Sequence, residues 1–562
     1  MRKGLVFLGV AAAAVLLATS ASADNRGASF TPVGFIDEPG QYPFSCVMAS
    51  SPDGTQFLVS PSFRYVYASK WTREGGWGEN VGAYASTFPA IASDGTIMAN
   101  GLYPGSDPGY GWPGIWMGET DLFDPLPPQD GYAPCGTGRM SFHGLSSNGA
   151  YATGLTYSGC GIVRAFRWDR ATDTTIELGT PNGRSTRGNA ISDDGSKVAG
   201  FGLLKFGLRR GATWTDGEWT WVDGQGNIGP KACISTGSEC TSNGDCPEFV
   251  DDASCPPSSK GTCQAGVCVG GFDAGLNCTN SSQCRGTCSG GPNNGLACTS
   301  NGACPDTPAC VANPNWSDDA FKGEAYDITP DGRYVTGRNF GWAEPEWWSG
   351  YRVNPDGTIT EIPVFEEFPD LLIEPYAVSD DGQVVVGFAG RVVTGFRPFF
   401  WSEATGIVDV QLFLYFQGYE DMLFWNLLRA HSVSADGTVL GGEGVNPNGQ
   451  IEGFVVDMKK VWVCHGPSND ASKARTLGVS FDSIGDHLGH GDFLGTCKFI
   501  ASGAAARGVE LRQQWLTEQP VELLRDRTGS SGDFGGWEPD LTTPAGRHAI
   551  ATPAGKQTRR ER

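Results

Sequence analysis

The chain carries little positive charge. Its 40 Lys and Arg residues stand against 62 Asp and Glu, for a formal net charge of −22. Proteins that bind nucleic acid need a basic surface to neutralise phosphates, so this balance argues against nucleic acid as a partner. The sequence also lacks the G-x-S-x-G elbow, the H-E-x-x-H helix, the phosphate-binding P-loop and the EF-hand loop. No residue is therefore assigned a catalytic role, and no cofactor is expected apart from a candidate divalent metal near the C-terminus.

Long apolar runs are absent after the first residues. Residues 1–23, MRKGLVFLGVAAAAVLLATSASA, combine a basic start, a short apolar core and a small-residue end. This pattern predicts a signal peptide that is cleaved before Asp24. The apolar core is shorter than the roughly 20 residues of a transmembrane helix, and no later segment qualifies. We therefore expect a secreted or extracellular protein with disulfides among its 17 Cys.

A short phrase recurs seven times along the chain. Each copy has small and apolar residues, a Ser or Thr, an Asp-Gly or Asn-Gly pair, and an alternating run that mostly ends in Gly. The copies are VMASSPDGTQFLVS (47–60), AIASDGTIMANG (90–101), GLSSNGAYATG (144–154), AISDDGSKVAG (190–200), DITPDGRYVTG (327–337), AVSDDGQVVVG (377–387) and SVSADGTVLGG (432–442). Asp-Gly between alternating runs predicts a hairpin with a type I′ turn, in which both central residues have positive φ.

The spacing of these turns predicts a β-propeller. Their glycines are separated by 41, 54, 46, 137, 50 and 55 residues, and the long gap holds a Cys-rich stretch, 232–314. Without that insert, every gap is near the size of one four-stranded blade. Second hairpins such as GATWTDGEWTWVDG (211–224) supply outer strands. We predict an all-β fold of seven four-stranded antiparallel blades, formed by 24–231 and 315–458. A long β-sandwich and an open solenoid are the alternatives.

The insert itself contains 12 of the 17 Cys, between Cys233 and Cys310, with three C-x5-C pairs. A stretch this poor in large apolar residues cannot build a core, so we expect disulfides to hold it. Zinc and iron–sulfur sites usually show C-x2-C pairs or interleaved His, and neither occurs here. The pairing stays open. Outside the insert, Cys135 and Cys160 are disulfide candidates, and the role of Cys46 is not assigned.

The repeated phrase, followed by A-F-R-W and a hydrophobic hairpin, resembles the HAF family of bacterial extracellular repeats. The similarity covers most of 40–458 and is greatest at 418–458, which looks like the terminal repeat of that family. The resemblance implies a β-propeller and gives no biochemical role. TolB-like repeats, which share the SPDG phrase of Ser51–Gly54, are the nearest alternative.

The C-terminal module, 459–500, carries the skeleton C-H-x-P, H-L-x-H-G-D and G-x-C. It resembles a recurrent C-terminal segment of secreted bacterial proteins whose function is not established. Imidazoles and a carboxylate in one short segment are a candidate metal site, and the residues concerned are His465, His487, His490 and Asp492. The alternative is a Cys464–Cys497 disulfide with the His residues packed locally. The remaining tail, 501–562, is expected to be mostly disordered.

Three further residue sets are candidates for functional sites. Paired carboxylates such as Asp193-Asp194 and Asp380-Asp381 recur in the repeats, so we interpret them as turn chemistry and not as calcium or acid–base sites. His143 and His431 open their repeat phrases and are expected on one inner-strand position. Trp347 and Trp348 are candidates for stacking on a glycan.

These observations favour a secreted, non-catalytic propeller that acts as a binding or scaffolding platform for an extracellular glycan or protein. The alternative is a polysaccharide hydrolase or lyase with carboxylates at the mouth of the ring. The sequence does not predict an oligomeric state.

Overall fold

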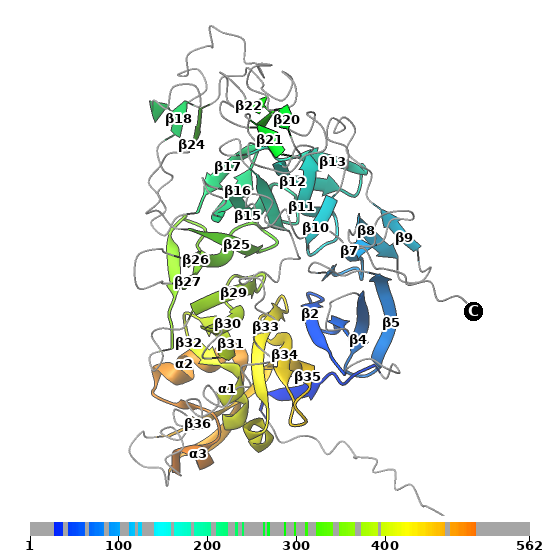
Figure 1. Ribbon diagram of the computed structural model, residues 1–562. Helices are drawn as coiled ribbons and strands as arrows, with labels where there is room; N and C mark the ends of the chain where they lie inside the picture. Colours follow the sequence, from blue (N-terminus) through cyan, green and yellow to red (C-terminus); the bar gives the residue numbers. More distant parts are fainter. Residues whose placement is uncertain are drawn as a thin grey trace, which may run out of the picture.

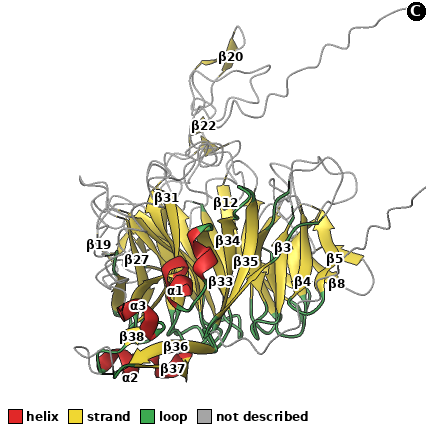
Figure 2. Cartoon of the chain, turned by 90° about the horizontal axis from the view of Figure 1, so that it is seen from below, coloured by secondary structure: helices red, strands yellow, loops and turns green. Residues whose placement is uncertain are grey.

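The computed structural model contains seven four-stranded antiparallel sheets arranged as the blades of a ring (Figure 1). It describes residues 27–36, 43–61, 67–83, 89–101, 112–117, 122–125, 140–158, 162–180, 185–203, 209–222, 322–340, 348–365, 372–391, 395–466 and 473–501, together with short strands between 231 and 312. The seven predicted hairpins each open one sheet, so the predicted all-β propeller of seven blades is confirmed. When the ring is seen from its side, the strands of successive blades lie side by side (Figure 2).

Each blade runs from an inner strand at the axis to an outer strand. The first four blades are β2 (Cys46–Ser50), β3 (Gln56–Ser60), β4 (Tyr67–Thr72) and β5 (Gly76–Ala83); β6 (Ala90–Ile91), β7 (Ile97–Gly101), β8 (Trp112–Met117) and β9 (Leu122–Pro125); β10 (Met140–Leu145), β11 (Tyr151–Ser158), β12 (Ile162–Asp169) and β13 (Thr174–Glu177); and β14 (Thr186–Ile191), β15 (Lys197–Leu203), β16 (Arg209–Thr215) and β17 (Glu218–Trp221).

The other three blades follow the insert. They are β25 (Lys322–Ile328), β26 (Val335–Phe340), β27 (Trp348–Val353) and β28 (Ile359–Ile362); β29 (Leu372–Val378), β30 (Val385–Arg391), β31 (Gly395–Ser402) and β32 (Gly406–Asp409); and β33 (Asn426–Val433), β34 (Val439–Val445), β35 (Ile451–Asp457) and β1 (Ser29–Pro32). Between the two groups the structure describes the backbone of short strands from β18 (Lys231–Cys233) to β24 (Cys310–Ala312).

The last blade is completed by the first strand of the chain. Strand β1 pairs antiparallel with β35, with Ser29 opposite Asp457 and Pro32 opposite Phe454. This contact joins the two ends of the propeller sequence and removes two unpaired strand edges. The use of β1 as the outer strand of the last blade was not predicted, because β1 stands alone and carries no copy of the repeated phrase.

The repeated turns differ from the predicted type. In the blade 1 turn only Gly54 has positive φ, at 68°, and its N–H donates to the Ser51 carbonyl at 2.9 Å. Asp53 instead uses its side chain: Oδ1 accepts from the Ser51 hydroxyl at 2.5 Å and from the Thr55 N–H at 3.1 Å. The expected type I′ geometry is therefore wrong for the repeats, although the interpretation of their Asp residues as turn chemistry holds.

The type I′ turn occurs in an outer hairpin. Asp216 and Gly217 have φ of 51° and 95°, and they join Thr215 to its cross-strand partner Glu218. A two-residue loop of type I′ needs positive φ at both of its residues. The longer loop of the repeats needs positive φ at its glycine alone.

Hydrophobic side chains fill the space between neighbouring sheets. Trp168, Trp214, Trp221 and Trp401 are buried, as expected for blade packing. One cluster spans the junction of the first and last blades, where Phe57 and Trp71 meet Val439 and Val455. Each sheet is thus covered on both faces by its neighbours, which accounts for the stability of blades that are small on their own.

The C-terminal module packs against the outside of the last blades. It contains β36 (Lys460–His465), β37 (Arg475–Ser480), η7 (Phe481–Ser483), α2 (Ile484–Gly489), β38 (Phe493–Leu494) and α3 (Cys497–Ala501). It rests on α1 (Val410–Phe416) and η6 (Glu420–Leu423), which connect blades six and seven (Figure 2). Val461 and Ile484 of the module share a hydrophobic cluster with Phe413 and Met422 of this connection.

The predicted signal peptide, 1–23, and the tail beyond Ala501 lie outside the described residues. So do the side chains of the Cys-rich insert, and its expected disulfides with them. Within the described part of the chain, no helix is long and apolar enough to cross a membrane.

Candidate functional site: the axial cavity and the C-terminal histidine cluster

The inner strands share an irregularity at one position. Their pairing with the second strand of the blade shifts by one residue, which is the signature of a β-bulge. The bulged residue always lies six positions before the turn glycine. In six blades it is Met48, His143, Asn189, Tyr326, Tyr376 and His431. A bulge turns a side chain away from the regular alternation, and all six residues line a cavity on the axis of the ring.

This axial cavity has a volume of about 240 Å³ and is built in layers. Turn residues including Pro52, Ser147, Pro330, Asp380 and Ala435 form its rim. An apolar collar lies four positions before each turn glycine and contains Ile91, Leu145, Ile191, Ile328, Val378 and Val433, with Ser50 in the first blade. The bulge layer follows, and beyond it lies a charged layer to which Arg187, Glu324 and Glu374 belong.

Backbone hydrogen bonds tie neighbouring turns together at the rim. The Ala435 N–H donates to the Pro52 carbonyl at 2.7 Å, across the junction between the last blade and the first. Asp193 donates in the same way to Pro330, and Asp380 to Ala435. These bonds link the turns of blades 7 and 1, of blades 4 and 5, and of blades 6 and 7.

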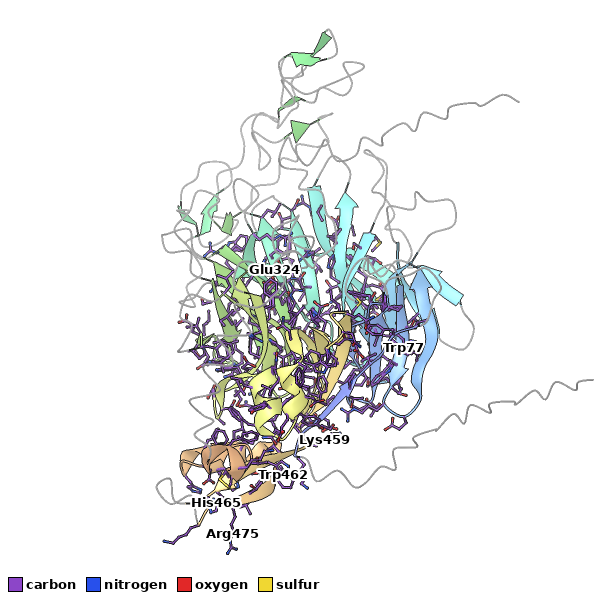
Figure 3. All side chains as sticks on the ribbon, turned by 60° about the horizontal axis from the view of Figure 1, so that its bottom comes forward. Trp77, Glu324, Lys459, Trp462, His465 and Arg475 are labelled. Carbon is purple, nitrogen blue, oxygen red and sulfur yellow. A yellow bond between two sulfur atoms is a disulfide. The ribbon has the colours of Figure 1, made fainter. Side chains whose placement is uncertain are left out.

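Glu324 is the most strongly paired group of the charged layer. It is fully buried and forms ion pairs with Arg187 and, at 2.9 Å, with Arg209, while Asn189 Nδ2 donates to it at 2.8 Å. Burial alone would raise the pKa of Glu324, but the Arg187 and Arg209 guanidiniums lower it to about 2. Glu324 therefore stays ionised and cannot supply a proton near neutral pH (Figure 3 places it inside the ring).

Glu374 is the equivalent of Glu324 in the next blade, and it has different partners. Glu374 forms an ion pair with Arg338 at 2.8 Å and accepts a hydrogen bond from the Tyr326 hydroxyl at 2.8 Å. Burial raises the pKa of Glu374, and the attraction of Arg338 only partly opposes this. Tyr376 then stacks on His431, with ring centroids 5.4 Å apart and planes 19° from parallel. Hydroxyls, imidazoles and aromatic faces thus meet around the axis.

Two carboxyls closer to the rim have raised pKa values. Burial raises the pKa of Asp327 to about 6, although the Val378 and Ile328 amides donate to it at 2.9 Å. Burial and the neighbouring Asp193 raise the pKa of Asp380 to about 6.

The two histidines expected on one inner-strand position do occupy it. His143 and His431 are both buried and both line the axial cavity. Burial, reinforced by the Arg187 charge, holds the pKa of His143 well below its usual value. The charged residues of the cavity were not predicted. Their signal was present, because Arg187, Glu324, Glu374 and Arg429 all lie eight positions before a turn glycine.

The C-terminal module contains the disulfide that the sequence offered as one alternative, and it brings together most of the candidate metal-binding side chains. Cys464 and Cys497 form a disulfide, with Cα atoms 4.7 Å apart. Beside it, the Nδ1 atoms of His465 and His487 each lie 2.7 Å from Oδ2 of Asp492, which is buried. His490 is not part of this cluster and instead caps α2 through its backbone. Three of the four predicted metal ligands therefore converge, and the histidine donors lower the pKa of Asp492 against the effect of burial.

The remaining predicted site residues are not described. Cys135, Cys160 and Trp347 lie outside the described residues. Trp348 begins β27, but its side chain is not among those described.

Comparison with known proteins found only distant similarity. No protein-family model and no curated protein sequence matches the chain. Among solved structures it is similar to a putative TolB from Agrobacterium tumefaciens, with 11% identity and a TM-score of 0.30 over 77% of this chain and 98% of that one. It is also similar to an oligogalacturonate lyase from Vibrio parahaemolyticus, with 10% identity and a TM-score of 0.37 over 77% of this chain and 97% of that one. Similarity at this level assigns neither an activity nor a ligand.

Proposed function

We propose that this chain is an exported, non-catalytic propeller that binds a small hydroxyl-rich group, such as the end of an extracellular glycan, in the axial cavity. The observation that carries the proposal is the bulge layer, in which inner strands direct Tyr326, Tyr376, Asn189 and two histidines to one axis. Aromatic faces beside hydrogen-bonding groups suit a sugar ring, which has apolar faces and polar edges.

The charge balance supports a ligand without a strong charge of its own. Glu324 and Glu374 are already neutralised by arginines of the same layer. A charged ligand would have to compete with these buried pairs, whereas hydroxyl groups need only the polar edges that remain.

The same carboxyls bear on the alternative of hydrolysis. A glycosidase needs one carboxyl as proton donor and another as base or nucleophile. Glu324 is held ionised by two arginines and cannot be the donor, whereas the pKa values of Glu374, Asp327 and Asp380 are raised, so experiment must separate binding from hydrolysis. The alternative of a hydrolase or lyase would be established by new products in a polysaccharide panel incubated with the full chain.

Binding is tested by titrating the full chain with soluble oligosaccharides and following the heat of binding. Tyr376→Ala removes a ring of the bulge layer and is expected to weaken binding at least tenfold. Phe424→Ala is the control, because Phe424 is an exposed aromatic residue outside the cavity. Equal binding by the two variants would place the ligand elsewhere.

We also propose that the His465, His487 and Asp492 cluster holds a divalent metal. Two imidazoles and a carboxylate are donors that suit zinc and similar ions. The His465 side chain is half exposed, so an ion would reach the cluster from solvent.

A further inference from the structure

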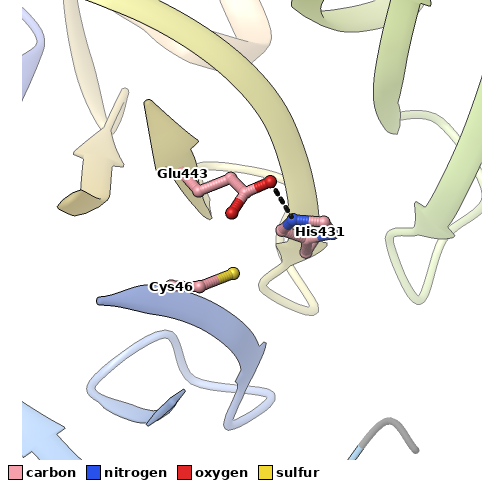
Figure 4. A group of neighbouring side chains, drawn as sticks. All are labelled: Cys46, His431 and Glu443. Atoms are coloured by element: carbon pink, nitrogen blue, oxygen red, sulfur yellow. Dashed lines mark ion pairs between the residues drawn. The ribbon is translucent and has the colours of Figure 1, made fainter. Parts of the chain in front are cut away.

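A second group of metal-binding side chains lies inside the ring, at the junction of the first and last blades. Cys46 belongs to β2 of blade 1, while His431 and Glu443 belong to β33 and β34 of blade 7. One ligand atom from each of the three lies within 4.8 Å of the other two. Figure 4 shows the Cys46 sulfur directed toward the two other side chains.

We infer that Cys46, His431 and Glu443 form a binding site for a thiophilic divalent ion such as Zn²⁺, which would join blade 1 to blade 7. A thiolate, an imidazole and a carboxylate are the three ligand types that zinc accepts in proteins.

The His431–Glu443 pair needs only a small adjustment. His431 Nε2 and Glu443 Oε1 are 3.9 Å apart, and the Cys46 sulfur lies within 4.8 Å of both. Two ligands of a tetrahedral ion with bonds of about 2.0–2.1 Å lie roughly 3.4 Å apart, so this pair would close by about half an ångström on binding.

The surroundings support the two non-sulfur ligands. Arg429 donates to Glu443 at 2.8 Å, and the stacked Tyr376 ring fixes the plane of His431. Hydrogen bonds to a ligating carboxylate orient it and tune its basicity. A carboxylate also has lone pairs for both an arginine and an ion.

All three ligands are buried, with Cys46 1%, His431 8% and Glu443 0% exposed. Burial keeps competing water away from a thiolate–metal bond. His431 lines the axial cavity, so the cavity is the entry route, and the fourth position of the ion would be filled from there.

The other histidine of the bulge layer provides an internal contrast. His143 occupies the same position in blade 3, but its charged neighbours are Arg187, Arg209 and Glu324. The described residues around His143 form no group of three metal-binding side chains. The sequence position alone therefore does not make the site; the residues across the blade junction do.

The test uses the full chain loaded with Co²⁺ after metal removal by a chelator. Binding through a thiolate gives a sulfur-to-cobalt charge-transfer band in the near ultraviolet. We expect the band in the wild type and in His143→Ala, and its loss in Cys46→Ser and in His431→Ala. The double variant His465→Ala with His487→Ala should keep the band, which separates this site from the C-terminal cluster.

A band that persists in Cys46→Ser, or no band in the folded wild type, would overturn the inference. If Cys46→Ser or His431→Ala fails to fold, Glu443→Gln replaces it, since the amide keeps the shape of the side chain but is a much weaker ligand. We expect Glu443→Gln to weaken Co²⁺ binding at least tenfold while circular dichroism stays that of the wild type. Unchanged Co²⁺ affinity in folded Glu443→Gln would equally count against the site.

Discussion

The Tyr326 hydroxyl donates a 2.8 Å hydrogen bond to Oε1 of Glu374, a residue of the neighbouring blade. Both residues come from inner strands, and Arg338 pairs with the same carboxylate oxygen. These two contacts link the charged layer of blade 5 to that of blade 6.

Removing the Tyr326 hydroxyl should weaken the ring. In Tyr326→Phe the buried Glu374 loses one of its donors, and hydrogen bonds to charged groups contribute about 1.5–3 kcal/mol. We expect a loss of this size in the free energy of unfolding, measured by urea denaturation. The control is Tyr415→Phe, since the ring contacts of Tyr415 with Phe416 and Phe499 survive the change. An equal loss in both variants would contradict a specific role for the Tyr326 bond.

Asp327 predicts a dependence of stability on pH. Its pKa is raised to about 6 in the folded chain against 3.8 for an ordinary Asp, so the folded state retains a proton that the unfolded state releases. Its contribution to stability is therefore full below about pH 4 and is lost as the pH rises to about 6, by at most about 3 kcal/mol. Unfolding curves at pH 4.5 and 7 should show a smaller change in Asp327→Asn than in the wild type. An equal change in the free energy of unfolding between pH 4.5 and 7 in the two proteins would rule out this titration.

Two turn glycines, Gly382 of a repeat and Gly357 of an outer hairpin, predict graded effects of an added methyl group. Gly382 and Gly357 both have positive φ, at 74° and 81°. A Cβ on Gly382 would collide with the Tyr334 ring, whereas a Cβ on Gly357 meets nothing within 4 Å. Gly357→Ala should cost about 1–2 kcal/mol for the left-handed backbone alone. Gly382→Ala should cost clearly more, and thermal unfolding of the two variants measures the difference. A Gly357→Ala variant as unstable as Gly382→Ala would show that backbone strain dominates.

The proposed C-terminal metal site can be tested by comparing a histidine inside the cluster with a neighbouring histidine outside it. His487→Ala removes a member of the cluster, while His490→Ala removes a nearby imidazole that lies outside it. We expect stoichiometric Zn²⁺, measured by elemental analysis in the Cys46→Ser background, to fall in His487→Ala and to persist in His490→Ala. Loss in both variants, or in neither, would contradict the assignment.

The blade count could be predicted because each blade contains the same turn between its two inner strands. A hairpin at the axis needs Ser, Asp and Gly at fixed offsets, as the contacts of Ser379 and Asp381 show again in blade 6. Local hydrogen bonds therefore leave a visible phrase in the sequence. The turn type was predicted wrongly because Asp-Gly occurs both in two-residue loops, as at Asp216, and in these longer loops.

Contacts between distant segments leave no such phrase. Cys46 and Glu443 meet only because the ring closes, and neither belongs to a motif that identifies the other. The C-terminal cluster was partly visible because its residues lie within a few dozen positions. Even there, spacing did not separate His487, which bonds to Asp492, from His490, the exposed C-cap residue of α2.

The pairing of β1 with β35 sets the order in which the molecule can be completed. The Gly34 N–H donates to Glu452 at 3.0 Å across 418 residues of chain, immediately beyond the strand that seals the last sheet. During synthesis from the N-terminus, the earliest strand must wait for the latest repeat before it finds its partner. The two strands that close the ring, β1 and β35, are thus synthesised first and last. We therefore expect a chain that is truncated before β35 to leave β1 unpaired and the ring open.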